Sequence, residues 1–230
     1  MSGWGLIARV MAGLTLVFLI APLLVIVPLS FNAEPFFTFT DRMLALDPDG
    51  YSTRWYQAIL NDTVWRDALV NSLIIGGAST AIATVLGTLA AMGLARGDVP
   101  LKGAIMGLLI SPMITPVIIA ATGMYFFYSD LGLTQTHLGL ILAHAALGAP
   151  FVVITVTASL TGYDWNLSRA GASLGASPAT TFFRVTLPLI LPGVISGALF
   201  AFATSFDEVV TVLFLGGPEQ VTIPRKMWSG

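Results

Sequence analysis

Residues 163–188 read YDWNLSRAGASLGASPATTFFRVTLP, a polar stretch between two strongly apolar ones. Asp164 or Asn166 can cap a short helix, because a side-chain oxygen at this position accepts a hydrogen bond from a free N–H of the first turn. That helix is expected to run to about Leu174 and to end at Gly175, since glycine readily takes left-handed backbone geometry. The first half of the stretch therefore predicts a helix closed by a sharp turn.

The second half of this stretch predicts another helix. Ser177 is a suitable cap, and Pro178 suits the first helical position, where no backbone N–H is needed. Phe182, Phe183 and Val185 would give this helix an apolar side. A helix–glycine–helix arrangement between two apolar stretches is a compact protrusion. We call residues 163–188 the elbow and expect it to be a docking surface, since a solvated linker would need neither caps nor aromatic residues.

The composition indicates a membrane protein. Of 230 residues, 56% are apolar and only 10% are charged, whereas a soluble domain typically carries about 25% charge. The mean hydropathy is +0.86. These values exclude an ordinary cytosolic enzyme domain, a disordered chain and a nucleic-acid-binding protein. The net charge of −2 gives no basic field for nucleic acid, and the absence of cysteine excludes disulfides and thiolate metal sites.

Five apolar stretches are long enough to span a bilayer, which requires about 20 residues of helix. None of them contains Lys or Arg. They are Val10–Phe31, Ala68–Leu94, Gly103–Tyr128, Leu138–Thr161 and Leu189–Leu215. The sequence thus predicts an all-α membrane protein that forms a single transmembrane domain over residues 1–230.

The orientation does not follow from the basic residues. If the N-terminus is cytoplasmic, Lys and Arg divide equally between the two sides of the membrane, so their bias does not decide. The long loop Asn32–Asp67 carries six acids and three arginines, which favours an external position for it.

Small residues at four-residue spacing predict close helix contacts in the bundle. Such pairs occur at Gly103 with Gly107 and at Gly193 with Gly197. Such pairs occur both in bundles with ordinary packing and in bundles that flex, so they do not distinguish the two.

Asp207 and Glu208 are adjacent acids inside the fifth apolar stretch. A charge near the bilayer centre costs on the order of 2.5 kcal/mol or more, so such acids face a polar cavity or a partner. Adjacent helical residues point about 100° apart, so one acid can face a central path while the other caps or pairs with a neighbour. Three interpretations stay open: recognition of a cationic solute, a structural ion pair with another subunit, and protonation of one acid without any function.

Motifs of catalysis are weak or missing. The phosphate-binding pattern G-x-x-x-x-G-K-[ST] is absent, so the chain does not bind ATP by that device. Residues 171–175 match the G-x-S-x-G of serine hydrolases, but that motif needs a strand–turn–helix setting and a nearby histidine. The histidines are His137 and His144, beside or within the fourth stretch, and His144 is expected to be a hydrogen-bonded residue of the bundle. We expect no catalytic residue and no metal ligand.

The elbow resembles the coupling loop of ABC-importer permeases. The family pattern is Glu-Ala-Ala, three residues, Gly, nine residues, and an aliphatic-x-Leu-Pro ending. Arg169-Ala170-Gly171, Gly175 and residues 185–188 (VTLP) match its spacing, with Arg169 in place of the usual Glu and Gly171 in place of the usual Ala. The resemblance implies contact with an ATPase subunit through residues 162–188. The implied coupling residues are Arg169, Ala170, Gly171, Leu174, Gly175, Ala176, Ser177, Pro178, Leu187 and Pro188.

The resemblance extends over nearly the whole chain. Residues 205–210 (SFDEVV), 214–218 (FLGGP) and 223–228 (IPRKMW) are similar to the second permease of spermidine/putrescine importers. Residues 54–56 (RWY) and 71–73 (NSL) fit the same branch. Asp207 and Glu208 are then expected on the path of a cationic substrate.

The resemblance implies a type I ABC-importer permease in the bacterial inner membrane. It implies a cytoplasmic N-terminus, an external Asn32–Asp67 and a sixth span after Gly230. The implied partners are a second homologous permease, two ATPase subunits that bind ATP and Mg²⁺, and an extracytoplasmic solute-binding protein; this chain itself would hold no cofactor. The alternatives are an ABC importer of another solute, such as an opine, an amino-acid derivative or an anion, a secondary transporter, and a membrane scaffold.

Overall fold

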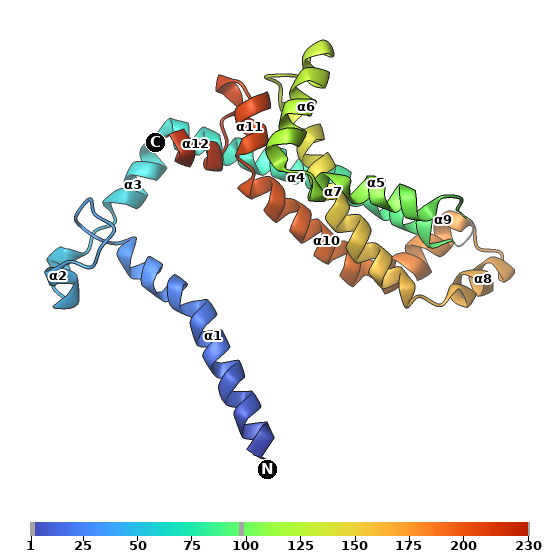
Figure 1. The fold of residues 1–230 in the computed structure, drawn as a ribbon, viewed down its shortest axis with the longest axis horizontal. Coiled ribbons are helices and arrows are strands. Elements are labelled where there is room, and N and C mark those ends of the chain that lie inside the picture. Colours follow the sequence, from blue (N-terminus) through green and yellow to red (C-terminus); the bar gives the residue numbers. More distant parts are fainter. Residues whose placement is uncertain (1–2, 97–98, 230) are drawn as a thin grey trace. The chain divides into compact units, whose positions relative to one another are not determined.

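The computed structural model describes residues 3–96 and 99–229, which are built almost entirely of helices (Figure 1). The chain divides into two compact units, Met1–Arg66 and Asp67–Gly230. The all-α class predicted from the sequence is confirmed. Within the described ranges, four single helices are long and apolar enough to cross a membrane, and a bent pair of helices could form a fifth span.

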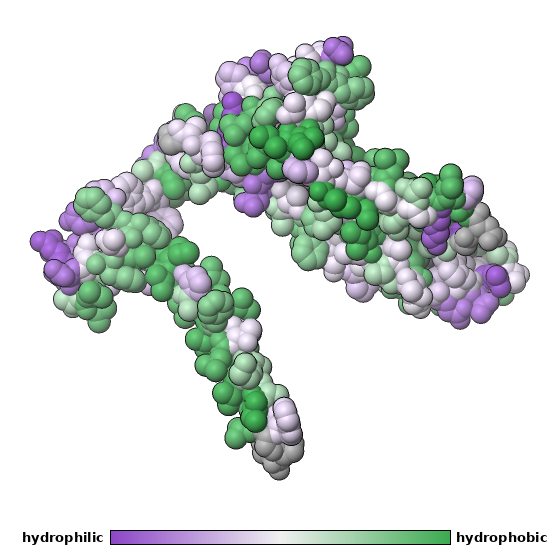
Figure 2. All heavy atoms as spheres, in the orientation of Figure 1, coloured by the Kyte–Doolittle hydropathy of each residue, from purple (hydrophilic) through white to green (hydrophobic). Residues whose placement is uncertain are grey.

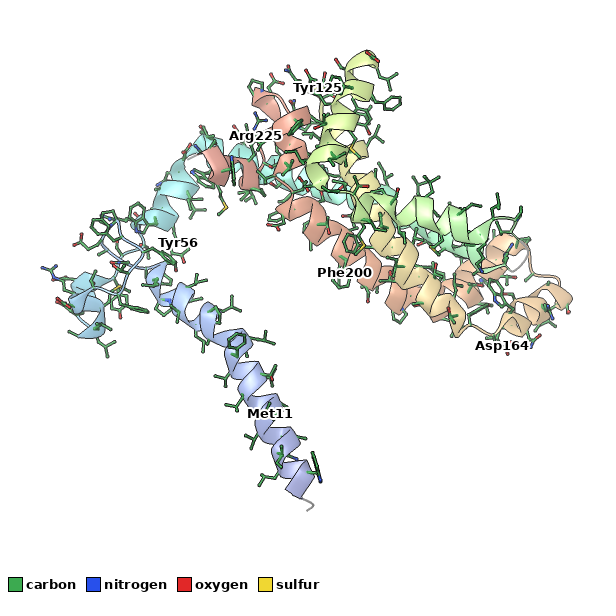
Figure 3. The ribbon with its side chains drawn as sticks, viewed as in Figure 1. Met11, Tyr56, Tyr125, Asp164, Phe200 and Arg225 are labelled. Atoms are coloured by element: carbon green, nitrogen blue, oxygen red, sulfur yellow. The ribbon has the colours of Figure 1, made fainter. Side chains whose placement is uncertain are left out.

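The first unit begins with α1, Gly3–Leu29, which is apolar on every side. None of its most apolar 18-residue window is buried, and Met11 projects freely from the helix (Figure 3). Figure 2 shows hydrophobic side chains along this helix. A helix that is apolar all round belongs in a membrane or deep inside a protein. α1 therefore suits the first predicted span, Val10–Phe31.

Asn32 organises the segment that follows α1. Its side-chain Nδ2 donates to the backbone carbonyl oxygens of Phe36 and Thr38, both at 2.8 Å. The backbone carbonyl of Asn32 accepts a hydrogen bond of 2.9 Å from Trp55 Nε1. Asn32 also forms an isolated antiparallel bridge with Tyr51. The segment contains α2 (Asp41–Leu44), a 3₁₀ turn (Pro48–Gly50) and α3 (Arg54–Asn61). The predicted loop Asn32–Asp67 is therefore packed and hydrogen-bonded.

The second unit carries the long helices of the bundle and the elbow. In chain order its elements are α4 (Thr63–Ala95, which begins in the first unit), α5 (Lys102–Ile114), α6 (Val117–Asp130), α7 (His137–Thr161), α8 (Trp165–Ser173), α9 (Pro178–Thr181), a π-helical turn (Phe182–Thr186), α10 (Leu187–Asp207), α11 (Val210–Leu215), a 3₁₀ turn (Pro218–Gln220) and α12 (Ile223–Ser229).

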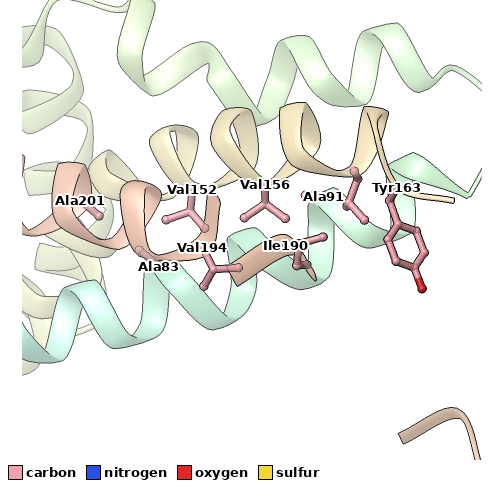
Figure 4. Close-up of a cluster of buried hydrophobic side chains, with 9 residues drawn as sticks. Ala83, Ala91, Val152, Val156, Tyr163, Ile190, Val194 and Ala201 are labelled. Atoms are coloured by element: carbon pink, nitrogen blue, oxygen red, sulfur yellow. The ribbon is translucent and has the colours of Figure 1, made fainter. Parts of the chain in front are cut away.

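The core of the second unit lies where α4, α7 and α10 meet (Figure 4). Valines of α7 and aliphatic residues of α10 pack there against alanines of α4, whose small side chains let the helices approach closely. The cluster comprises Ala83, Ala91, Val152, Val156, Leu160, Tyr163, Ile190, Val194 and Ala201. α7 and α10 lie side by side along most of their length (Figure 1).

The contact predicted for Gly193 and Gly197 is confirmed. A Cβ atom on Gly193 would lie 2.8 Å from the Thr155 carbonyl oxygen, and one on Gly197 would lie 2.8 Å from Val152 Cα. The backbones of α7 and α10 therefore approach closely at both glycines. Gly103 and Gly107, the other predicted pair, have no atom of the described residues within 4 Å of an added Cβ.

The third predicted span, Gly103–Tyr128, is not one straight helix. α5 ends at Ile114 and α6 begins at Val117, with a bend of 103° between them. Thr115 is extended at ψ 132°, since the ring of Pro116 clashes with a helical conformation of the residue before it. The two halves together satisfy the length and hydropathy of one span.

The fifth predicted span, Leu189–Leu215, is interrupted in a different way. α10 ends at Asp207, Glu208 is extended at ψ 119°, and α11 starts at Val210. The two acids therefore lie at a helix break, not inside a continuous helix. At its other end α10 continues back through the π-helical turn into α9, so that residues 178–207 form one apolar helical stretch of 30 residues.

A glycine substitution tests the α7–α10 contact. We expect Gly197→Ala to destabilise the chain by about 1–3 kcal/mol, because its Cβ is forced against the backbone of Val152. Gly107→Ala is the matched control: it meets open space, and its better helix propensity should stabilise α5 by up to about 1 kcal/mol. Thermal unfolding of the purified variants measures both shifts. Equal shifts of the two melting temperatures would contradict the contact.

Candidate functional site

The first candidate site is the break between α10 and α11. Glu208 is half-buried, and its Oε1 accepts a hydrogen bond of 2.8 Å from the backbone N–H of Thr211 in the first turn of α11. A carboxylate at this position satisfies an otherwise free helix donor and complements the positive end of the helix dipole. Glu208 is thus the capping member of the predicted pair of acids.

Asp207 is the exposed acid of the pair. Its side chain forms no hydrogen bond or ion pair with any residue of the described ranges 3–96 and 99–229. It lies at the C-terminal end of α10, where free carbonyl groups concentrate negative potential. Its carboxylate borders two open pockets, one lined by Ala203, Thr204 and Glu208 and the other lined by Phe206, Val209, Ile223, Pro224, Met227 and Trp228.

A buried polar cluster fixes the last turn of α10. Ser205 Oγ lies 2.7 Å from His144 Nδ1 of α7 and accepts a hydrogen bond of 3.1 Å from Ser79 Oγ of α4. All three residues are buried. His144 is therefore the hydrogen-bonded bundle residue that the sequence predicts. The cluster ties three helices together two residues before Asp207.

A second polar group holds the segment after α11 against the start of α4. Asn71 Nδ2 donates to the carbonyl oxygens of Glu219 and Val221 at 2.8 and 3.0 Å, and Asn71 Oδ1 lies 2.9 Å from His137 Nε2. Nearby, Arg225 of α12 donates to the Gly217 carbonyl at 2.8 Å (Figure 3). The contact of His137 with Asn71 was not predicted, because the two residues are 66 positions apart in the sequence.

The second candidate site is the elbow, and its local geometry is as predicted. Asp164 accepts a hydrogen bond of 2.9 Å from the Asn166 N–H and caps α8 (Figure 3). Gly175 has a φ of +82°, in the left-handed region. Ser177 Oγ accepts from the Thr180 N–H at 3.1 Å, and Pro178 is the first residue of α9.

Most of the predicted coupling residues form the surface of the elbow. Leu174 is 89% exposed beside Gly175. Gly171, Ala176 and Leu187 are half-buried, and the remainder are exposed, namely Arg169, Ala170, Gly175, Ser177, Pro178 and Pro188. That these residues contact an ATPase stays a prediction.

A hydroxyl group joins the two ends of the elbow. Tyr163 Oη lies 2.6 Å from Ser168 Oγ of α8 and 3.1 Å from Thr186 Oγ1 at the end of the π-helical turn. Trp165 packs edge-on against the Tyr163 ring, with centroids 5.1 Å apart. Sequence reasoning missed Tyr163 and Thr186, which match no motif and meet only through the turn at Gly175.

The structure explains why position 171 is Gly, where the family pattern has Ala. A Cβ on Gly171 would lie 3.2 Å from Thr181 Oγ1 and 3.5 Å from its Cγ2. Glycine therefore lets α8 lie close to α9 opposite a branched residue. The sequence alone could not pair these positions.

Comparison with known proteins identifies the class. The chain belongs to the family of binding-protein-dependent transport system inner membrane components, which matches residues 83–229. Among its relatives is the spermidine/putrescine transport system permease protein PotC of Haemophilus influenzae, 31% identical over 212 residues, which are 92% of this chain and 79% of PotC. The putrescine transport system permease protein PotI of Escherichia coli is 32% identical over 219 residues, 92% of this chain and 75% of PotI.

The fold is also that of a solved transporter. The crystal structure of a bacterial ABC transporter involved in the import of the acidic polysaccharide alginate contains a chain that matches with a TM-score of 0.73. The match covers 98% of this chain and 78% of that one at 16% identity. At this identity the likeness concerns the fold alone.

Removing the Tyr163 hydroxyl tests whether this group joins the two ends of the elbow. We expect Tyr163→Phe to lower the free energy of unfolding by about 1 kcal/mol, since the substitution removes the hydroxyl group that joins Ser168 and Thr186. Amide exchange in α8 should then be about fivefold faster, as measured by hydrogen–deuterium exchange. Tyr125→Phe is the control, because Tyr125 is 41% exposed and its hydroxyl bonds to none of the described residues. Identical amide exchange rates of α8 in the two variants would show that the Tyr163 hydroxyl does not join the two ends of the elbow.

Proposed function

We propose that this chain is a transmembrane subunit of a bacterial ATP-driven importer of putrescine, spermidine or related cationic solutes. Its family and its likeness to PotC and PotI support an importer of this kind. The chemistry of the break at Asp207 supports a cationic substrate.

Asp207 carries the proposal. Its carboxylate has no partner within the described residues and lies where the carbonyl end of α10 adds negative potential. Ends of broken helices in transporters bind cations for this reason. An unpaired acid in an apolar stretch is costly, and a passing ammonium group offsets that cost. Phe206 and Trp228 line one of the adjoining pockets and can contact the methylene chain of a polyamine.

The proposed complex contains a second homologous permease, two ATPase subunits that bind ATP and Mg²⁺, and an extracytoplasmic solute-binding protein. The N-terminus and the elbow face the cytoplasm in this arrangement. The packed segment Asn32–Asp67 and residues 216–230 face outward. The bilayer surrounds α1 and the exposed apolar sides of the second unit.

The proposed transmission runs along one helical stretch. Residues 178–207 extend about 45 Å at 1.5 Å per residue, from the elbow to Asp207. Movement of the elbow with the ATPase subunits would displace the far end of α10 and change the surroundings of the carboxylate. A ligand shifts such an equilibrium only by binding its two states differently, so the loaded solute-binding protein must favour the outward-open state.

Neutralising the two acids separately tests the substrate site. We expect Asp207→Asn to reduce uptake of radiolabelled putrescine by about tenfold or more, since a charge-assisted contact of about 1.5–3 kcal/mol with the ammonium group is lost. Glu208→Gln should act more weakly, because the amide oxygen can still accept from Thr211. Both variants must assemble at wild-type levels. Wild-type uptake in both would remove these acids from the substrate path.

The turn at Gly175 tests the coupling. A side chain in the left-handed region costs about 1–2 kcal/mol, so Gly175→Val should distort the elbow. ATP hydrolysis should then lose its stimulation by the solute-binding protein, while basal hydrolysis persists. Gly175→Asn is the matched control, because asparagine tolerates this geometry and should retain most of the stimulation. Normal stimulation of Gly175→Val would contradict the role of the turn.

A further inference from the structure

One face of α10 carries both Asp207 and an exposed aromatic ring. Phe200 comes seven residues before Asp207, and seven residues make almost two turns of a helix, so the two side chains project in nearly the same direction. Phe200 is 56% exposed (Figure 3). An α-helix rises about 10.5 Å over seven residues, which separates the two positions along α10. This side of the helix, which we call the Asp207 face, thus has a carboxylate at one end and an aromatic ring at the other.

Small residues lie between these two side chains. Ala203 and Thr204 line the open pocket of about 540 Å³ that Asp207 borders. Ala203 is exposed and Thr204 is half-buried. Side chains of this size leave the surface of the helix open, so that a thin chain of methylene groups can lie along it. α10 contains no Lys or Arg, so no basic group of this helix repels an amine on the Asp207 face.

The Phe200 ring packs against a second ring from α7. The rings of Phe151 and Phe200 are stacked at an interplanar angle of 20°, with centroids 6.1 Å apart. Phe151 is half-buried, so it supports the more exposed ring of Phe200 from the side of α7. The face of an aromatic ring attracts an ammonium group that lies within about 6 Å of the ring centroid, and the attraction is stronger when the cation is desolvated.

The carboxylate of Asp207 indicates which medium this face meets. An ionised acid is too costly in hydrocarbon, so it faces a polar cavity or a partner. Ser196 lies on the same face, because the eleven residues between it and Asp207 make about three turns, and it too is exposed. A side of α10 that presents Ser196, Ala203 and Asp207 is therefore suited to the transport path, and Phe200 lies within it.

We propose that Phe200, supported by Phe151, binds the distal ammonium group of a polyamine whose other end is bound by Asp207, so that the Asp207 face favours longer polyamines over putrescine. The inference rests on the proposed function, because it takes Asp207 as the site of the first ammonium group. Putrescine has five bonds between its nitrogens, and at about 1.5 Å per bond it spans no more than about 7.5 Å. The nine bonds of spermidine give about 13.5 Å of chain, which is enough to reach both positions.

Two labelled substrates in the complete reconstituted complex test the proposal. Initial uptake of radiolabelled spermidine and of radiolabelled putrescine is measured for each variant with saturating solute-binding protein. We expect Phe200→Leu to lower spermidine uptake about three- to tenfold and putrescine uptake less than about twofold, because leucine is apolar but has no ring. Phe200→Trp should keep the wild-type ratio of the two rates, since its ring also offers a face to the ammonium group.

Three further variants serve as controls. Phe127→Leu is the matched control, because Phe127 is 62% exposed on α6 and lines neither pocket beside Asp207. It should leave both rates unchanged. Asp207→Asn should lower both rates, since both amines use this carboxylate. Trp228→Leu tests the opposite direction, because Trp228 lines the second pocket beside Asp207; it should not lower the spermidine-to-putrescine ratio.

The outcomes separate this inference from the proposed function. If the wild-type complex takes up neither amine, the proposed function fails and the inference fails with it. If it takes up both amines and Phe200→Leu leaves their ratio unchanged, only the subsite at Phe200 is overturned. Uptake of putrescine without spermidine would also overturn the subsite.

A structural role of Phe200 has its own signature. An equal loss of both rates in Phe200→Leu, or loss of the second permease when this variant is purified, would place Phe200 at a lipid or subunit surface and overturn the subsite. A ratio that falls in Trp228→Leu but not in Phe200→Leu would direct the longer amine toward α12 and overturn it as well.

Discussion

The hydrogen bond from the Thr211 N–H to the Glu208 carboxylate makes a helix break possible within an apolar stretch. In hydrocarbon, a backbone donor without a partner costs several kcal/mol, so an interrupted span must satisfy its free groups internally. Glu208 does this for α11. The Ser79–Ser205–His144 cluster holds the opposite side of the break by tying α10 to α4 and α7. With one acid used as a cap, Asp207 is left at the carbonyl end of α10, exposed and unpaired among the described residues.

The same helix links this break to the elbow. α10 is packed against α7 through Gly193 and Gly197, so the two helices form closely fitted surfaces. At the other end, Tyr163 joins α8 to the π-helical turn that continues into α10. A partner that displaces α8 therefore acts on α10 through hydrogen bonds and continuous helix. This arrangement gives the proposed coupling a physical route without any contact between the elbow and the substrate.

Local signals in the sequence predicted much of the elbow and of the α7–α10 contact. Caps, the left-handed glycine and the small residues at positions 193 and 197 act on their own helix or its nearest neighbour, so spacing and residue type suffice. The bend at Pro116 and the break at Glu208 were not predicted, because hydropathy does not register a change of backbone direction. The contacts of Asn71, His137, Tyr163 and Thr181 were not predicted, because each one's partner is distant in the sequence or belongs to no motif. The opposed roles of Asp207 and Glu208 became specific only when the break gave each its own helix end.

The most direct test of a cation importer is ATP hydrolysis by the complete reconstituted complex with its solute-binding protein, measured against polyamines, amino-acid derivatives, neutral sugars and anions. The account predicts that putrescine or spermidine stimulates hydrolysis and that neutral and anionic solutes do not. Stimulation by a non-cationic solute alone would contradict it and would return Asp207 to a structural role.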